Sequence, residues 1–189
     1  MITTKSEIEN YLLTTIDASF NTQVDKWIKA MQTYIESLAN RSILELASKT
    51  YRYTGNNAHV LFVDDFTEIT EVKIGGTTLP DTEYVAKPFN LTYVNQLRYV
   101  NGSKWSGAKE GDIEITGKKG MFAEADVPED LRFACTVLVA GIVQASSNEN
   151  KEIQSETIGR YSVSYKTDTQ KVDYKNALEI ARSYRRVTI

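Results

Sequence analysis

The hydrophobic pattern of this chain changes its period twice, and these two changes limit the folds that it can adopt. Apolar residues recur every three to four positions before residue 48 and again after residue 121, as in amphipathic helices. Between residues 49 and 120 the pattern becomes a series of short runs, several of them alternating, as in half-buried strands. This order predicts an α+β fold. A small helical core of about four helices, residues 1–48 and 121–189, would carry an antiparallel β-rich sub-domain, residues 49–120, between its second and third helices.

Four segments of the two helical zones carry an apolar stripe. We expect helices over residues 4–17, 22–40, 129–147 and 174–186, and the first two should pack as a hairpin because their connection is short. Pro128, followed by two acidic residues, marks the start of the third helix. That segment is apolar on almost every side, so it should be the central and most buried helix.

The middle zone predicts six or seven short strands, mostly antiparallel because their connections are short. Gly75-Gly76 and Asn101-Gly102 each separate two strand-like runs, which is the signal of a two-residue hairpin turn. The apolar run 60–63 is suited to a buried strand, and Asp64-Asp65 after it is interpreted as a turn. The segment 117–120 (Gly-Lys-Lys-Gly) lacks the spacing and the following Ser/Thr of a phosphate-binding loop, so it is interpreted as a flexible loop.

Residues that could carry out chemistry are few. The chain has one histidine, His59, and one cysteine, Cys135, so it cannot build a multi-histidine metal site or an intramolecular disulfide. Cys135 lies in an apolar run and is expected to be a small buried residue rather than a reactive thiol. Asp64 and Asp65 could bind a divalent cation, but successive strand residues point to opposite faces. We therefore predict a protein that is not an enzyme and has no catalytic residues, metal site or cofactor.

The net charge of −3 argues against a dedicated nucleic-acid-binding protein. Arg182, Arg185 and Arg186 form one basic cluster, explained either by contact with phosphate or an acidic partner, or by favourable charge near a helix C-terminus. The first ten residues are acidic and polar, unlike a signal peptide, and no apolar stretch is long enough to span a membrane. We expect a soluble protein made in a cytoplasm, without a membrane partner.

Several features occur in a recognisable order. Two amphipathic helices are followed by a helix that opens Val127-Pro-Glu-Asp-Leu-Arg-Phe-Ala, then by Ser155-Glu-Thr-Ile-Gly-Arg-Tyr-Ser-Val-Ser-Tyr, and last by Ala177-Leu-Glu-Ile-Ala-Arg-Ser-Tyr-Arg-Arg. In this order the chain resembles the head–tail connector (adaptor) family of tailed bacteriophages and prophages. The run 60–74, with Gly117 closing a later strand, is similar to members that carry a β-rich insertion.

The resemblance implies a structural protein of the virion neck, assembled in the cytoplasm of the bacterial host. Copies would form a ring under the portal protein, commonly with the portal's twelvefold symmetry, and would extend the channel through which double-stranded DNA passes transiently. The ring would link head to tail by offering a platform to the next neck (head-closure) protein. The smallest family members are almost wholly helical, so the role of the inserted sub-domain does not transfer; we expect it to face outward from the ring.

The resemblance also assigns candidate contact residues. The portal-docking candidates are Tyr184, Arg185 and Arg186. The candidates for contact between neighbouring copies are Glu156, Ile158, Gly159, Tyr161, Val163 and Tyr165. An extended segment with alternating aromatic residues would present an unpaired strand edge, which suits such a contact.

Two alternative functions are left open. The chain could be another virion part, such as a head-closure or tail-terminator protein, but these are more wholly β-barrel, so four helices would disfavour that interpretation. It could also be a carbohydrate- or protein-binding module with Trp105 and the tyrosines as a stacking platform. That second interpretation requires exposed aromatic residues on one face of the sheet.

Overall fold

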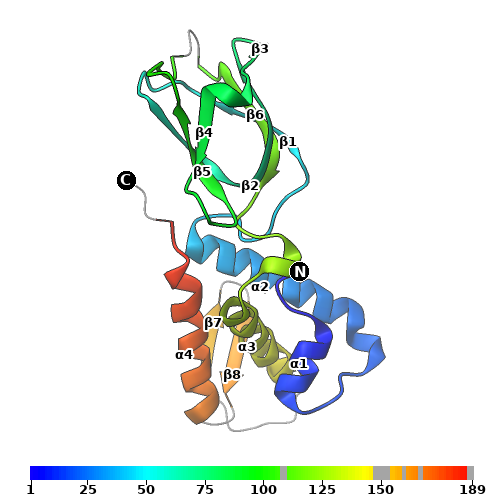
Figure 1. Cartoon of the computed structure of the whole chain (residues 1–189). Coiled ribbons are helices and arrows are strands. Elements are labelled where there is room, and N and C mark those ends of the chain that lie inside the picture. Colours follow the sequence, from blue (N-terminus) through cyan, green and yellow to red (C-terminus); the bar gives the residue numbers. More distant parts are fainter. Residues whose placement is uncertain (107–109, 147–153, 159–160, 166–167, 187–189) are drawn as a thin grey trace. The chain divides into compact units, whose positions relative to one another are not determined.

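A computed structural model describes residues 1–106, 110–146, 154–158, 161–165 and 168–186 of the chain (Figure 1). The chain forms two compact units: unit 1 contains Met1–Asn40 and Val127–Ile189, and unit 2 contains Arg41–Asp126. The described residues form four α-helices, with an antiparallel sheet inserted between the second and the third. The predicted α+β fold with an inserted β region is confirmed.

Unit 1 is built around one apolar helix. Its elements are α1 (Lys5–Leu12), a short 3-10 helix η1 (Ala18–Phe20), α2 (Asn21–Ala39), α3 (Glu129–Ser146), β7 (Gln154–Ile158), β8 (Tyr161–Tyr165) and α4 (Asp168–Ser183). Helix α3 contacts α1, α2, α4 and β8, and its residues are buried on nearly every side between Leu131 and Ile142. The prediction of a central helix is therefore confirmed. Helix α1 packs more extensively on α3 than on α2.

Helix α1 begins with a side-chain cap, whereas α2 has none, and both helices are followed by a residue in the same backbone conformation. The side chain of Thr4 accepts a hydrogen bond from the backbone of Glu7, and the Glu7 side chain accepts one from the backbone of Thr4, which forms a capping box at the start of α1. Helix α1 ends at Leu13 and α2 ends at Asn40, both in the left-handed backbone conformation. Asparagine is common at such a position, whereas leucine there costs roughly 1 kcal/mol.

Unit 2 is a six-stranded, strongly curved antiparallel sheet (Figure 1). Its strands are β1 (Lys49–Tyr53), β2 (Val60–Ile74), β3 (Thr77–Thr78), β4 (Tyr84–Lys87), β5 (Val94–Tyr99) and β6 (Ile113–Lys119), with short 3-10 helices at Asp81–Glu83 and Glu124–Asp126. The order is β1-β6-β2-β5-β4, and β3 pairs with β2. The concave side holds a core formed by Leu61, Val63, Phe66, Val72, Leu97, Trp105, Ile113 and Ile115.

One of the two predicted hairpin turns is present. Gly75 and Gly76 both have positive φ, 57° and 81°, and connect the paired ends of β2 and β3. The Asn101-Gly102 prediction is wrong, because residues 103–106 form no strand. Instead, the backbone N–H of Trp105 donates a hydrogen bond to the Ala58 carbonyl, which fixes this segment against the start of β2.

Two predicted loops are parts of strands. Strand β2 continues through Asp64-Asp65 to Ile74, because its pairing register with β5 shifts between Phe62 and Phe66 and so accommodates the acidic pair without a turn. Gly117 lies in β6 rather than in a flexible loop. A side chain there would overlap the carbonyl oxygen of Glu68, so the glycine permits β2 to approach closely.

Candidate docking surfaces

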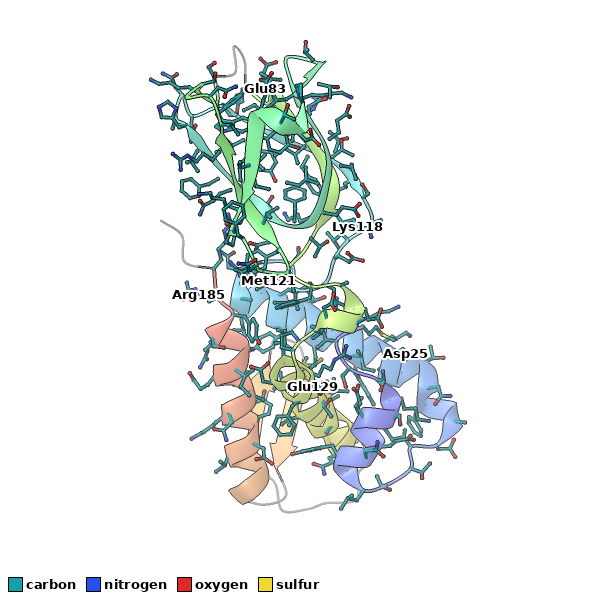
Figure 2. The ribbon with its side chains drawn as sticks, viewed as in Figure 1. Asp25, Glu83, Lys118, Met121, Glu129 and Arg185 are labelled. Carbon is teal, nitrogen blue, oxygen red and sulfur yellow. The ribbon has the colours of Figure 1, made fainter. Side chains whose placement is uncertain are left out.

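The three predicted portal-docking residues lie at the C-terminal end of α4, and the structure gives them different roles. The Tyr184 hydroxyl donates a hydrogen bond to Asp130 Oδ1 at 2.8 Å. The backbone N–H of Arg186 donates to the Ala39 carbonyl at 2.8 Å. These two bonds tie the end of α4 to the start of α3 and to the end of α2. The Arg185 side chain is exposed and points outward from the end of α4 (Figure 2).

Tyr184 and Arg185 differ in what their side chains can do: Tyr184 fixes the end of α4 through a hydrogen bond, and Arg185 is an exposed cation. Burial, reinforced by the hydrogen bond and the charge of Asp130, raises the pKa of Tyr184 to about 12. Its hydroxyl therefore stays protonated at neutral pH and can donate to the carboxylate. Arg182, one turn earlier, is paired with Glu179 at 2.7 Å. Arg185 is thus an exposed cation of the cluster, near the C-terminal end of a helix, where its charge is favourable to the helix dipole.

The predicted stretch of contact between copies forms two strands rather than one extended segment. Strands β7 and β8 pair antiparallel from Gln154↔Tyr165 to Ile158↔Tyr161. Among the predicted contact residues, this register pairs Glu156 with Val163 and Ile158 with Tyr161, while Tyr165 pairs with Gln154. Gly159 lies outside the described residues.

The β7–β8 hairpin has an open backbone edge. Strand β8 contacts α3 and α4, whereas within the described part of the chain β7 pairs only with β8. A two-stranded sheet is marginally stable by itself, and an uncovered edge accepts a strand from another chain unless it is protected. The hairpin edge at β7 is therefore a candidate for contact with another chain.

The residues considered for catalysis or metal binding are not arranged for either. Asp64 Oδ2 lies 3.0 Å from Lys119 Nζ, and Asp65 Oδ2 lies 3.2 Å from Arg41 Nε, so each carboxylate has its own cation. Burial raises the pKa of the Cys135 thiol to about 12, which disfavours the nucleophilic thiolate. Among the described residues, no group of three or more His, Cys, Asp or Glu side chains could hold a metal ion. None of the helices in that part of the chain is long and apolar enough to cross a bilayer.

The stacking-platform interpretation is wrong for Trp105. Its side chain is fully buried and packs against Tyr84 and Tyr99, with ring centroids 6.5 and 4.6 Å from its own. These aromatic rings belong to the small core of the sheet and leave the indole no exposed face for a ligand.

Comparison with known proteins identifies the family. The model of the head completion protein family matches residues 1–187. The chain belongs to the head completion protein family. The predicted resemblance to head–tail connectors is thereby confirmed, and this head completion protein is a structural protein of the phage neck. Among curated proteins, none matches the chain.

Solved structures share the fold of this head completion protein along nearly its whole length. A chain from the neck of an empty gene transfer agent particle, computed with C6 symmetry, has a TM-score of 0.63 at 12% identity and covers 97% of this chain and 89% of its own. A chain from the neck of the native particle, computed with C12 symmetry, has a TM-score of 0.56 at 14% identity, with 97% and 88% covered. A chain from the virion of the native particle gives 0.60 at 13% identity, with 97% and 89% covered.

Sequence reasoning missed a group of large apolar side chains that the head completion protein leaves exposed. They include Leu13 and Phe20 in the α1–α2 connection of unit 1, Phe62 on β2 of unit 2, and Phe89 and Leu91 in the connection between β4 and β5. Phe62 belongs to the run 60–63, which was predicted to be a buried strand. Only Leu61 and Val63 face the core, because the sheet covers one side of β2. The run of four apolar residues was the available signal, since one-sided burial explains only every second residue.

Proposed function

We propose that this head completion protein forms a ring under the portal of its phage, extends the DNA channel and links head to tail. The observation that carries the proposal is the shared fold, along 97% of the chain, with subunits of gene transfer agent necks computed with C6 and C12 symmetry. A ring requires a heterologous, head-to-tail contact that closes on itself. Twelve copies would match the twelvefold symmetry that is common for portal proteins. The work of such a protein is assembly rather than catalysis.

Portal docking is assigned to the end of α4. Tyr184 and the backbone of Arg186 hold this end against α3 and α2, while Arg185 projects outward. An arginine on a pre-organised support loses less entropy on binding than one on a free tail, and a guanidinium suits a carboxylate on the partner. The three residues would therefore act as one charged anchor on a fixed base.

Contact between neighbouring copies in the ring is assigned to the β7–β8 hairpin. The edge of β7 that does not pair with β8 would offer backbone hydrogen bonds, and the predicted contact residues lie within these two paired strands. An edge contact of this kind joins unlike surfaces of two copies and so suits a ring.

Passage of DNA agrees with the overall charge. The chain carries a net charge of −3, and a strongly basic lining would bind phosphates and slow the sliding of the duplex. We further propose that the inserted sheet faces outward, that the upper surface of the ring receives the next neck protein, and that assembly takes place in the host cytoplasm.

Imaging the protein with its portal tests this function. The purified chain, alone and mixed with the portal protein of the same phage, would be examined by negative-stain electron microscopy. A ring, or added density at the narrow end of the portal, is expected. Arg185→Glu should weaken portal binding, whereas Lys175→Glu, the same charge change at an exposed position of α4, should not. No ring and no portal binding under any condition would refute the proposal.

A further inference from the structure

The connection between α1 and α2 ends in an exposed apolar tip, defined here as the helical tip (residues 13–20). Leu13 is 92% exposed, and Phe20 is also exposed. Asp17 is the single charged residue of this segment. Two exposed large apolar side chains within eight residues form a surface that water solvates poorly.

Hydrogen bonds hold the helical tip in one conformation. Lys5 Nζ donates to the Ile16 carbonyl at 2.8 Å, and Glu9 Oε1 accepts from the Ile16 N–H at 2.8 Å. The Asp17 carboxylate accepts from the Ser19 N–H at 2.8 Å, and hydrogen bonding with Ser19 keeps the pKa of Asp17 below its usual range. The helical tip is thus a rigid protrusion with an apolar surface and one negative charge. Binding through it would require little further ordering of the chain.

The backbone conformation at Leu13 indicates that this side chain has a role other than stabilising its own chain. Leu13 has φ 53°, a conformation that favours glycine or asparagine, and the equivalent end of α2 is indeed an asparagine, Asn40. Leucine therefore costs stability here, while its side chain makes almost no contact within the chain. Such strain, kept at an exposed position, points to a contact with another molecule.

Unit 2 carries a second exposed apolar surface, on the convex side of β2, β5 and β4. The pairing register forms two outward rows across these strands, Val60–Arg98–Val85 and Phe62–Gln96–Lys87. Phe62 is 56% exposed, and beyond the end of β4 Phe89 is 62% exposed, with Lys87 Nζ 5.4 Å from its ring centroid. We define the outer sheet patch as these six positions with Phe89.

The two surfaces complement each other in charge and in apolar character. The charged residues of the outer sheet patch, Lys87 and Arg98, are both cations, whereas the charge of the helical tip is the carboxylate of Asp17. We propose that the helical tip of one copy docks on the outer sheet patch of a second copy of this chain. Leu13 and Phe20 would pack against Phe62 and Phe89, and Asp17 would lie near the two cations.

This contact joins two different surfaces, so repeated copies generate a ring when the rotation closes. The inference rests on the proposed ring and names a contact within it that is separate from the β7–β8 edge. It also gives the inserted sheet a role in assembly, because the outer sheet patch would bind the next copy.

A pair of substitutions separates this contact from folding. Leu13→Asn should keep or raise the stability of the fold, because asparagine suits the left-handed conformation, yet raise the concentration needed for half-maximal ring assembly at least about tenfold. Phe62→Thr, in the outer sheet patch, should likewise raise the concentration needed for half-maximal ring assembly. The matched control is Val172→Thr, an exposed apolar residue of α4 outside both surfaces, which should leave assembly unchanged. Urea unfolding would check the stability of each variant.

Disulfide trapping tests the pairing directly. The native thiol of Cys135 is buried, so introduced cysteines are the reactive ones. A mixture of Leu13→Cys and Phe62→Cys chains should give a cross-linked heterodimer on oxidation, and neither variant alone should cross-link efficiently. If wild-type rings form but Leu13→Asn assembles as well as Val172→Thr and no 13–62 cross-link appears, this contact is wrong and the ring stands. If the wild-type chain stays monomeric at every concentration, alone and on its portal, both proposals are overturned.

Discussion

Replacing Asp65 with asparagine is expected to destabilise unit 2 by about 3 kcal/mol. Asp65 is 2% exposed and its Oδ2 lies 3.2 Å from Nε of Arg41, which is 9% exposed. Removing one partner of a buried ion pair leaves the other charge uncompensated, at about 3–5 kcal/mol. The ring of Tyr93 lies 5.3 Å from the Arg41 guanidinium carbon, so the cation that remains is not wholly without a partner and the lower end of the range applies.

The matched control is Asp64→Asn, one residue earlier in the same strand. Asp64 is 35% exposed and pairs with Lys119 at 3.0 Å, so its ion pair is screened by solvent and should contribute less than about 1 kcal/mol. The assay is urea unfolding followed by Trp105 fluorescence in a Trp27→Phe background, where Trp105 reports on unit 2 alone. Equal destabilisation by the two substitutions would refute the argument from burial.

Removing both charges of the Arg41–Asp65 pair at once tests the same reasoning. Replacing both partners with apolar residues, as in Arg41→Met with Asp65→Leu, should recover most of the lost stability because no uncompensated charge remains. A divalent-cation site at Asp64-Asp65 would instead make wild-type stability depend on Mg²⁺ or Ca²⁺. The separate cation partners predict no such dependence.

Two further predictions concern packing and pH. Gly117→Ala should cost about 3 kcal/mol, because the added methyl group overlaps the backbone carbonyl of Glu68. Gly102→Ala is the control in the same thermal unfolding assay: an added Cβ meets no atom within 4 Å there, so only the positive φ opposes it, at about 1 kcal/mol. The raised pKa of Tyr184 means that its hydrogen bond to Asp130 stabilises the fold fully below pH 10 and is lost as the pH rises from 10 to about 12. Tyr184→Phe should therefore flatten stability in that window, and a pH profile identical to wild type would contradict the assigned tether.

The helices and the sheet were predictable because their signals are local. Pro128 with the acids after it marks the start of α3, and Gly75-Gly76 marks a hairpin that the structure contains. The errors arose where long-range packing overrides local preference. Asp65 stays in a strand because Arg41, distant in sequence, pairs with it. Asn101-Gly102 makes no hairpin because Trp105 enters the core of the sheet instead of continuing a strand.

The candidate contact residues were predictable only as sequence segments. The pattern placed Glu156 to Tyr165 in extended structure but missed that it divides into two strands, since alternation looks the same in each of two successive strands. Tyr184 and Arg185 carry equal weight in the sequence. Only the structure distinguishes them: Tyr184 is held by a hydrogen bond to Asp130, whereas Arg185 is exposed.

The exposed apolar residues explain why a subunit made for assembly is harder to interpret than a monomer. An apolar pattern predicts that a side chain is removed from water, but it does not say whether its own chain or another copy removes it. Phe62 was therefore assigned to the core together with Leu61 and Val63, although the sheet of one copy buries only the latter two. If Phe62 becomes buried in the ring, the assignment of the whole run to a buried environment was right for the assembly and wrong only for the isolated chain. Protection of Phe62 on assembly, measured by its loss of reactivity as Phe62→Cys, would distinguish these two cases.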